Sequence, residues 1–128
     1  MTKNLDKEGL SSIVDNYQLF YVDLWGVVHN GVNLHFEAIK ALKEISKKRK
    51  DYILLTNAPR PNHIVRSFLE KLGMEKEIRD HVFTSGEAAL LYLKKNLSNQ
   101  KFFHVGPPRD FDLFQNFEKK KNKRYREL

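Results

Sequence analysis

Two polar residues that follow apolar runs are the features of this chain best suited to chemistry. Asp23 ends the apolar run of residues 19–22, and a glycine-punctuated loop follows it. Thr56 ends a second apolar run, residues 52–55, and is followed by Asn57. Runs of this kind are typical of buried β-strands. Because open α/β sheets bind ligands at the carboxyl ends of their strands, we expect one shared site built from both ends.

Phosphoryl transfer is one chemistry that such a site can perform. An aspartate carboxylate can attack phosphorus and form an aspartyl-phosphate, which water then hydrolyses. Because carboxylate and phosphate repel each other, the site needs a cation, and Mg²⁺ binds carboxylates, backbone carbonyls, waters and substrate phosphate. N–H groups of the loop around Gly26, the Thr56 hydroxyl and the Asn57 amide could donate to phosphoryl oxygens. The alternative is that Asp23, Thr56 and Asn57 are ordinary turn and capping residues.

The elements that would position these residues alternate between strands and helices. Helical periodicity and capping signals predict helices over residues 5–15, 36–48, 61–72, 85–96 and 111–114. Strands are predicted over residues 19–23, 52–56, 82–84 and 102–105. This alternation predicts an α/β fold with a parallel sheet and right-handed crossovers. Asp23 and Thr56 would then emerge at the same edge of that sheet.

The length and composition are those of one globular domain. The 128 residues are 41% hydrophobic and 30% charged, and the chain has no cysteine, which excludes disulfides and thiolate metal sites. No apolar stretch approaches the ~20 residues that span a bilayer, and the N-terminus has no signal-like apolar core. We therefore expect a cytoplasmic protein with no membrane partner.

The net charge of +7 is concentrated at one end of the chain. Residues 117–128 contain six Lys and Arg and two Glu, without helical or strand periodicity. A basic tail can bind nucleic acid phosphates, but a disordered, solvated tail is the favoured interpretation, so a nucleic-acid partner is not expected. The five histidines show no metal-ligand spacing, and a zinc site is not expected either.

The motifs at the two strand ends resemble those of the haloacid dehalogenase (HAD) superfamily of aspartate-nucleophile hydrolases. The resembling segments are Tyr-Val-Asp-Leu-Trp-Gly-Val at 21–27 and Ile-Leu-Leu-Thr-Asn at 53–57. They are most similar to class IIA, the branch that contains para-nitrophenyl-phosphatase-like enzymes and phosphatases of sugar or nucleotide phosphates. That branch typically has a further glycine, here Gly31, and an arginine before the next helix, here Arg60.

This resemblance implies a Rossmann-like core with an inserted α/β cap. Residues 1–60 would be the N-terminal part of the HAD-like core, residues 61–116 part of the cap, and residues 117–128 the basic tail. Within the middle segment, residues 84–89 and 105–110 look like class IIA cap segments.

The resemblance also implies roles for individual residues. Asp23 would be the nucleophile and a Mg²⁺ ligand, and the backbone carbonyl of Trp25 would be a second Mg²⁺ contact. The residues that would contact the phosphoryl group or the substrate are Thr56, Asn57, Gly26, Trp25 and Arg60, with a solvated side chain as the alternative for Arg60. The substrate would be a small phosphorylated metabolite chosen by the cap.

Two departures from the family pattern limit what this chain is expected to do. Phosphatases of the superfamily usually carry a second Asp two residues after the nucleophile as general acid and base, and an indole such as Trp25 cannot do this. The family's third motif, a Lys, and its acidic fourth motif follow the cap and have no match here. We therefore expect the N-terminal portion of a longer enzyme, with a frameshift at Lys119–Lys121 as one hypothesis.

Two functions follow from these observations. The first is a Mg²⁺-dependent, phosphatase-like class IIA hydrolase that acts through an aspartyl-phosphate, with this chain as a truncated copy whose activity on its own the missing motifs leave open. The alternative is a non-catalytic fragment or pseudoenzyme that binds phosphorylated ligands or a homologous partner. A partial core also leaves strand edges and apolar faces uncovered, so we expect self-association into homo-oligomers.

Overall fold

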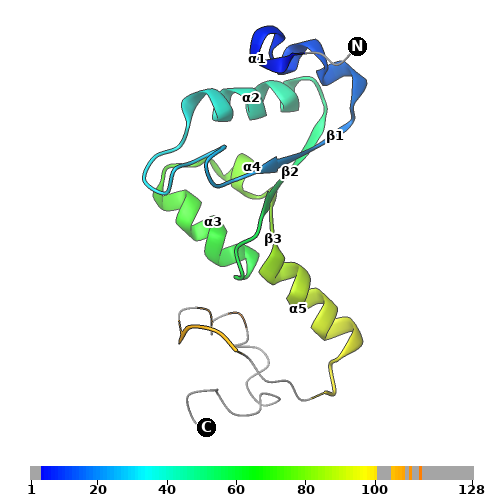
Figure 1. Ribbon diagram of the computed structural model, residues 1–128, viewed down its shortest axis with the longest axis vertical. Helices are drawn as coiled ribbons and strands as arrows, with labels where there is room; N and C mark the ends of the chain where they lie inside the picture. The colour runs from blue at the N-terminus through cyan, green and yellow to red at the C-terminus, as the bar shows by residue number, and fades with distance from the viewer. Residues whose placement is uncertain (1–3, 101–104, 109, 111–112, 114–128) are drawn as a thin grey trace. The chain divides into compact units, whose positions relative to one another are not determined.

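The computed structural model describes residues 4–100, 105–108, 110 and 113 (Figure 1). Its contacts divide the chain into two compact units. The first comprises Met1–Thr56 and Arg66–Val82, and the second comprises Asn57–Val65 and Phe83–Leu128. The predicted strand 102–105, the predicted short helix 111–114 and the tail 117–128 lie wholly or largely outside the described residues.

A three-stranded sheet in the order β1-β2-β3 is the framework of the fold. Its strands are β1 (Leu19–Asp23), β2 (Asp51–Thr56) and β3 (Val82–Thr84). β1 and β2 are parallel, with Leu19 opposite Asp51 and Asp23 opposite Leu55. The helix α2 (Phe36–Lys47) connects them, as the βαβ pattern predicts. The predicted α/β, Rossmann-like architecture is confirmed.

The core of the first unit lies on one face of β2. Tyr52 and Leu54 alternate inward along this strand and are 3% and 0% exposed, as the period of two in a strand requires. Leu42 and Ile45 are the buried residues of α2. Other buried apolar residues described in this unit are Val14, Leu24, Val28, Leu69, Met74, Ile78 and Val82.

The described helices agree with the sequence expectation except near the N-terminus and at α4. The helices are α2, α3 (Asn62–Lys71) and α5 (Ser85–Asn96), together with the unpredicted short helix α4 (Lys76–Arg79). The predicted continuous helix over residues 5–15 is wrong. The helix α1 (Leu5–Glu8) ends at Gly9, whose φ of +70° departs from the helical region, and two short 3₁₀ segments follow. No helix among the described residues is long and apolar enough to cross a membrane.

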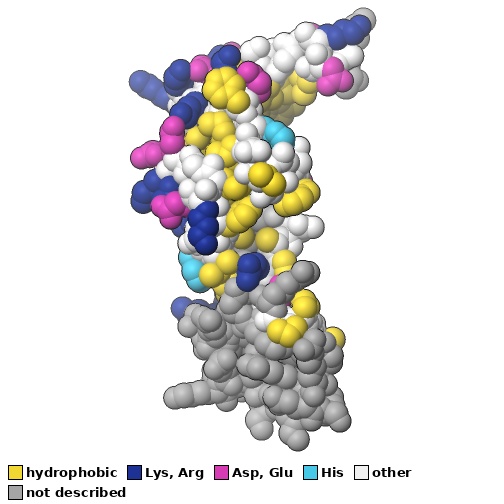
Figure 2. Space-filling model, turned by 90° about the vertical axis from the view of Figure 1, so that its left-hand side faces the viewer, with side chains coloured by type: hydrophobic (Ala, Val, Ile, Leu, Met, Phe, Trp, Pro, Cys, Tyr) yellow, Lys and Arg dark blue, Asp and Glu magenta, His cyan; other side chains and the backbone are white. Residues whose placement is uncertain are grey.

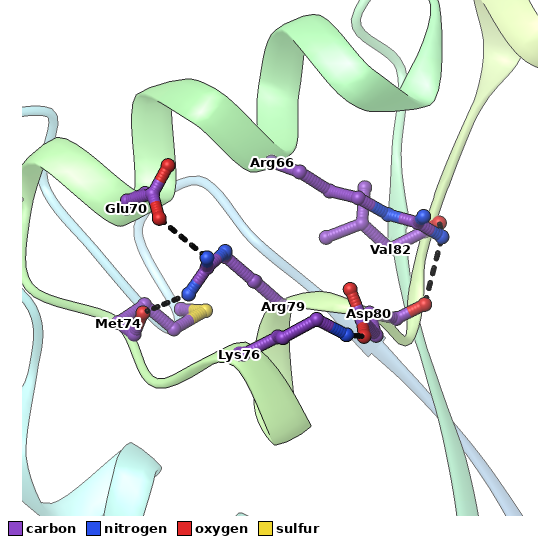
Figure 3. A network of polar contacts seen from close by, with 7 residues as sticks. All are labelled: Arg66, Glu70, Met74, Lys76, Arg79, Asp80 and Val82. Carbon is purple, nitrogen blue, oxygen red and sulfur yellow. Dashed lines mark hydrogen bonds and ion pairs between the residues drawn. The ribbon is translucent and has the colours of Figure 1, made fainter.

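Hydrogen bonds and ion pairs connect α3 to the segment that leads into β3 (Figure 3). A guanidinium nitrogen of Arg66 donates to the carbonyl oxygens of Asp80 at 2.8 Å and Val82 at 3.4 Å. Arg79 donates to the Glu70 carboxylate at 2.5 Å. The same close-up shows the Arg79 guanidinium donating to the Met74 carbonyl. It also shows the ion pair between Lys76 and Asp80. Since the carboxylates of both ion pairs are exposed, these pairs orient the segment more than they stabilise it.

The second unit is organised around the N-terminus of α5. The Thr84 side chain accepts the N–H of Glu87 at 2.9 Å, which makes Thr84 the N-cap of the helix predicted over residues 85–96. The other half of a capping box is absent here, because the Glu87 carboxylate accepts the N–H of Asn62 at 2.9 Å. The Asn62 side chain in turn accepts the N–H of Thr84 at 2.9 Å. These bonds join the start of α3 to the start of α5.

The loop that follows Thr56 lies directly on the first turn of α5. The N–H of Gly86 donates to the carbonyl of Ala58 at 3.1 Å, and the Thr84 hydroxyl donates to the carbonyl of Arg60 at 2.5 Å. A Cβ at position 86 would be 2.3 Å from the backbone nitrogen of Arg60. Only glycine therefore permits this approach of loop and helix.

Two structural observations bear on the predicted boundary at residue 60, which stays a prediction. β3, which lies within the segment 61–116, is hydrogen-bonded into the same sheet as β1 and β2. The two compact units also interleave along the chain rather than meeting at one position. The assignment of the rest of the segment to a cap stays a prediction.

Candidate functional site

Asp23 and Thr56 end neighbouring parallel strands. Asp23 lies opposite Leu55 in the register of β1 and β2, and Thr56 is the next residue of β2. The Asp23 carboxylate is exposed, and its Oδ1 accepts the N–H of Leu24 at 2.8 Å. Both residues therefore emerge at the carboxyl edge of the sheet, the edge at which open α/β sheets bind ligands. Their joint action on a ligand stays a prediction.

The loop after Asp23 is closed by its own backbone. The N–H groups of Val28 and His29 both donate to the carbonyl of Leu24, at 2.9 and 3.2 Å. The N–H of Gly26 donates to the carbonyl of His29 at 2.8 Å. Leu24 and Val28 are 1% and 0% exposed, so they anchor this loop in the core. The residues between these anchors are consequently held next to Asp23.

The closure of this loop bears on the predicted role of Gly26. Gly26 has a φ of +78°, and its N–H already donates to the carbonyl of His29. In this conformation a phosphoryl oxygen would have to bind other donors. Within the described part of the chain, the N–H groups of Trp25 and Val27 have no hydrogen-bond acceptor. These two amides are the better placed donors, and Gly26 shapes the turn that presents them.

His29 is the residue whose importance sequence reasoning underestimated. It is 5% exposed, and its ring meets Trp25 and Phe68 edge to face, with centroids 5.5 and 5.6 Å apart. Its Nδ1 accepts the N–H of Gly31 at 3.0 Å, an arrangement that requires the neutral tautomer with hydrogen on Nε2. The pattern His-Asn-Gly in a tight loop is the sequence signal for such a side chain to backbone bond.

The electrostatic environment of His29 agrees with that tautomer. Burial lowers the pKa of His29, and the neighbouring His35 lowers it further. The Asp23 carboxylate opposes both effects by raising the pKa. His29 therefore stays neutral at pH 7 while lying within electrostatic reach of Asp23.

Trp25 occupies the position two residues after Asp23. Its side chain is 65% exposed, and a Cβ added to Gly31 would be 2.7 Å from the indole ring. The indole thus lies on the surface of the loop against the Gly31 backbone. Because it has no titratable group, it cannot protonate a leaving group, which agrees with the sequence analysis.

Two oxygen donors in this loop fit the requirements of Mg²⁺. No group of three or more His, Cys, Asp or Glu that could hold a metal occurs among the described residues. Asp23 Oδ2 and the Trp25 carbonyl receive no hydrogen bond in the described ranges. Mg²⁺ is commonly bound by one or two carboxylates and completed by water and substrate phosphate. The donor set therefore fits such an ion in chemistry and in number.

Asn57 and Arg60 belong to the second compact unit. Asn57 is exposed, and the loop containing both residues is bound to the start of α5 as described above. The residues of α5 and its N-cap that hold this loop include Thr84, Ser85 and Gly86, none of which sequence analysis assigned to the site. The predicted contacts of Asn57 and Arg60 with a phosphoryl group or substrate stay predictions.

A cavity of about 260 Å³ lies elsewhere in the first unit. Val14 from the N-terminal segment and Ala41 and Ile45 from α2 contribute to its lining. It contains no residue of the candidate site. Figure 2 shows one face of the molecule, with apolar side chains in the middle of the view and charged side chains along its upper left edge and at its upper end.

These features define an α/β protein with a Rossmann-like core and an aspartate at the carboxyl end of its first strand. The chain belongs to the haloacid dehalogenase-like hydrolase family, whose model matches residues 20–119. The predicted resemblance to the HAD superfamily is thereby confirmed, whereas the finer assignment to its class IIA branch stays a prediction. None of the curated proteins compared with the chain matches it significantly.

Three solved structures with this fold are longer than the chain. A haloacid dehalogenase-like hydrolase from Brucella suis is 33% identical, with a TM-score of 0.71 over 83% of this chain and 38% of that one. A 4-nitrophenylphosphatase from Thermotoga maritima is 22% identical, with a TM-score of 0.65 over 81% and 40%. A glycerol phosphate phosphatase from Mycobacterium tuberculosis, solved with magnesium, is 24% identical, with a TM-score of 0.60 over 81% and 31%. The chain thus spans less than half the length of each.

Proposed function

We propose that this fold hydrolyses small phosphorylated metabolites through an aspartyl-phosphate on Asp23, with Mg²⁺ as cofactor. The observation that carries the proposal is the exposed Asp23 at the carboxyl end of β1, one register step from Thr56, in a chain of the HAD-like hydrolase family. The phosphatase names of two similar structures support the same reaction class.

In the proposed reaction, Asp23 attacks the phosphorus and the bond to the leaving oxygen breaks. A water molecule then attacks the phosphorus of the aspartyl-phosphate, which releases inorganic phosphate and restores the carboxylate. The Thr56 hydroxyl and the free amides of Trp25 and Val27 donate to the phosphoryl oxygens. Bound Mg²⁺, held by Asp23 and the Trp25 carbonyl, would neutralise the negative charge of the site.

The residue at position 25 narrows the class of substrate. Because Trp25 cannot protonate the departing oxygen, the reaction favours leaving groups that depart as stable anions. Acyl phosphates and aryl phosphates have such leaving groups, whereas alkyl phosphates do not. Acetyl phosphate and para-nitrophenyl phosphate are therefore the substrates of choice for a first assay.

A second candidate is phosphate binding without turnover. Two observations favour it: an indole stands at the usual position of the acid and base, and the chain spans only 38% of the Brucella hydrolase. Phosphate release in the presence of Mg²⁺ that is lost in Asp23→Asn supports the hydrolase. Saturable binding of inorganic phosphate without release from either substrate supports the binding protein.

A further inference from the structure

The loop after Asp23 contains a dipeptide that is prone to spontaneous chemical modification. Asn30 is followed by Gly31, and no other asparagine of the sequence precedes a glycine. The backbone nitrogen of the residue after an asparagine can attack the side-chain amide. Glycine obstructs this attack least, because it has no Cβ beside the nitrogen and its backbone reaches the required conformations. Asn30 is also exposed, so water reaches it.

The reaction at such a dipeptide needs only water. The nitrogen of Gly31 forms a bond to Cγ of Asn30, and the bond from Cγ to the side-chain nitrogen breaks. The hydrogen of the Gly31 nitrogen passes through solvent to the departing group, which leaves as ammonia. Water then opens the resulting cyclic imide at one of its two carbonyls. The product is aspartate or isoaspartate at position 30.

In the folded loop, hydrogen bonds already hold both reacting groups. The N–H of Gly31 donates to Nδ1 of His29 at 3.0 Å. The side-chain oxygen of Asn30 accepts the N–H groups of Val32 at 3.0 Å and of Asn33 at 2.8 Å. The backbone closes the same turn, since the N–H of Asn30 donates to the carbonyl of Asn33 at 3.1 Å. Cyclisation must move Cγ onto the Gly31 nitrogen and take the hydrogen from it, and both changes disrupt these bonds.

We propose that Asn30 is a deamidation site that the closed loop keeps latent, so that it reacts when the loop opens or the chain unfolds. The bonds to the Asn30 oxygen and the Gly31 nitrogen should together slow the reaction roughly tenfold or more relative to the unfolded chain. His29 is 5% exposed, and its ring packs against Trp25 and Phe68, which fixes Nδ1 as an acceptor. The protection therefore depends on His29 as well as on the turn.

Conversion at position 30 alters the surface beside Asp23. Aspartate keeps an oxygen acceptor for the turn and adds a negative charge to the loop. Isoaspartate places a side-chain carbon in the backbone, so the bonds to Val32 and Asn33 do not both re-form. Because the Gly31 backbone lies against the indole of Trp25, this product should also displace the indole. None of these steps depends on hydrolysis by Asp23.

The test incubates the full chain at neutral pH, folded and unfolded in urea, and follows position 30 by peptide mapping with mass spectrometry. A peptide of residues 26–36 is a second unfolded reference. We expect Asn30 to convert in both unfolded samples and roughly tenfold or more slowly in the folded chain. Over the same period the other asparagines should stay unchanged. The fluorescence of Trp25, the only tryptophan of the sequence, should change as the folded sample converts.

His29→Phe tests the part played by the histidine. A phenyl ring can keep the edge-to-face contacts with Trp25 and Phe68, but it offers no acceptor to the N–H of Gly31. We expect the folded variant to convert roughly threefold or more faster than the folded wild type. Asn33→Ala is the matched control, because Asn33 contributes backbone groups to the turn, and it should react at the wild-type rate. Circular dichroism shows whether both variants are folded.

Equal rates in the folded and unfolded wild type would overturn the proposal, because the loop would then give no protection. Absence of conversion in urea and in the peptide would overturn it too, since position 30 would not be a deamidation site. A folded His29→Phe chain that reacts as slowly as the wild type would contradict the role of His29. If that variant does not fold, the comparison of folded and unfolded wild type still decides.

Discussion

The indole of Trp25 lies against the backbone of Gly31, six residues further along the loop that follows Asp23. The same glycine donates its N–H to Nδ1 of His29, and the His29 ring meets the indole edge to face. These contacts make Trp25 a structural part of the loop. The residue that stands in the usual place of the catalytic acid therefore shapes the surface beside Asp23 instead of supplying a proton.

We expect Gly31→Ala to destabilise this loop more than Gly26→Ala does. Both glycines have positive φ, +91° and +78°, so both substitutions carry a conformational cost. Only at position 31 would the new methyl group meet the indole, at 2.7 Å, whereas at position 26 nothing lies within 4 Å. Because the indole is 65% exposed and can shift, the additional loss should be at most about 1 kcal/mol in urea unfolding. Equal losses in the two variants would show that the indole is not held where the structure has it.

Gly86→Ala should loosen the loop that follows Thr56. Helix propensity alone favours alanine by about 1 kcal/mol, but a Cβ at position 86 would be 2.3 Å from the Arg60 backbone nitrogen. Backbone atoms are less easily displaced than side-chain atoms. We therefore expect a net loss of stability and faster exchange of the backbone amide hydrogens of residues 57–62. Ala88 is an exposed residue of the same helix, so Ala88→Gly measures the difference in helix propensity between alanine and glycine on its own. A stabilised Gly86→Ala variant with unchanged exchange would contradict the close approach.

The neutral His29 predicts a pH dependence of stability. Since burial lowers the pKa of His29 in the folded chain, the unfolded chain binds more protons as the pH falls below about 6.5. The associated stability is complete above that pH and is lost as the pH falls through the folded-state pKa. The slope reaches at most about 1.4 kcal/mol per pH unit.

The measurement is urea unfolding of the wild type and of His29→Gln between about pH 7.5 and 5. We expect the wild-type free energy of unfolding to fall more steeply than that of the variant, because the other four histidines are common to both proteins. Parallel pH profiles would mean that His29 is protonated as readily in the folded chain as in the unfolded one.

Local patterns predicted the elements that position Asp23, because a strand-helix-strand unit has few ways to fold. The alternation of residues 19–56 was sufficient to predict parallel strands and the common edge of Asp23 and Thr56. The break at Gly9 was not predicted, since the apolar spacing on both sides of it continues the helical period. The bonds of Asn62 with Thr84 and Glu87 join residues more than 20 positions apart, which no local pattern reveals.

The measurement that tests the account most directly is phosphate release from acetyl phosphate and para-nitrophenyl phosphate with Mg²⁺, by the wild type, Asp23→Asn and Asp51→Asn. Asp51 is an exposed carboxylate at the opposite end of β2, so its variant controls for the loss of one negative charge. We predict release by the wild type and Asp51→Asn, and about 100-fold less by Asp23→Asn. Equal release by Asp23→Asn, or none above its background by the wild type, would contradict catalysis by Asp23.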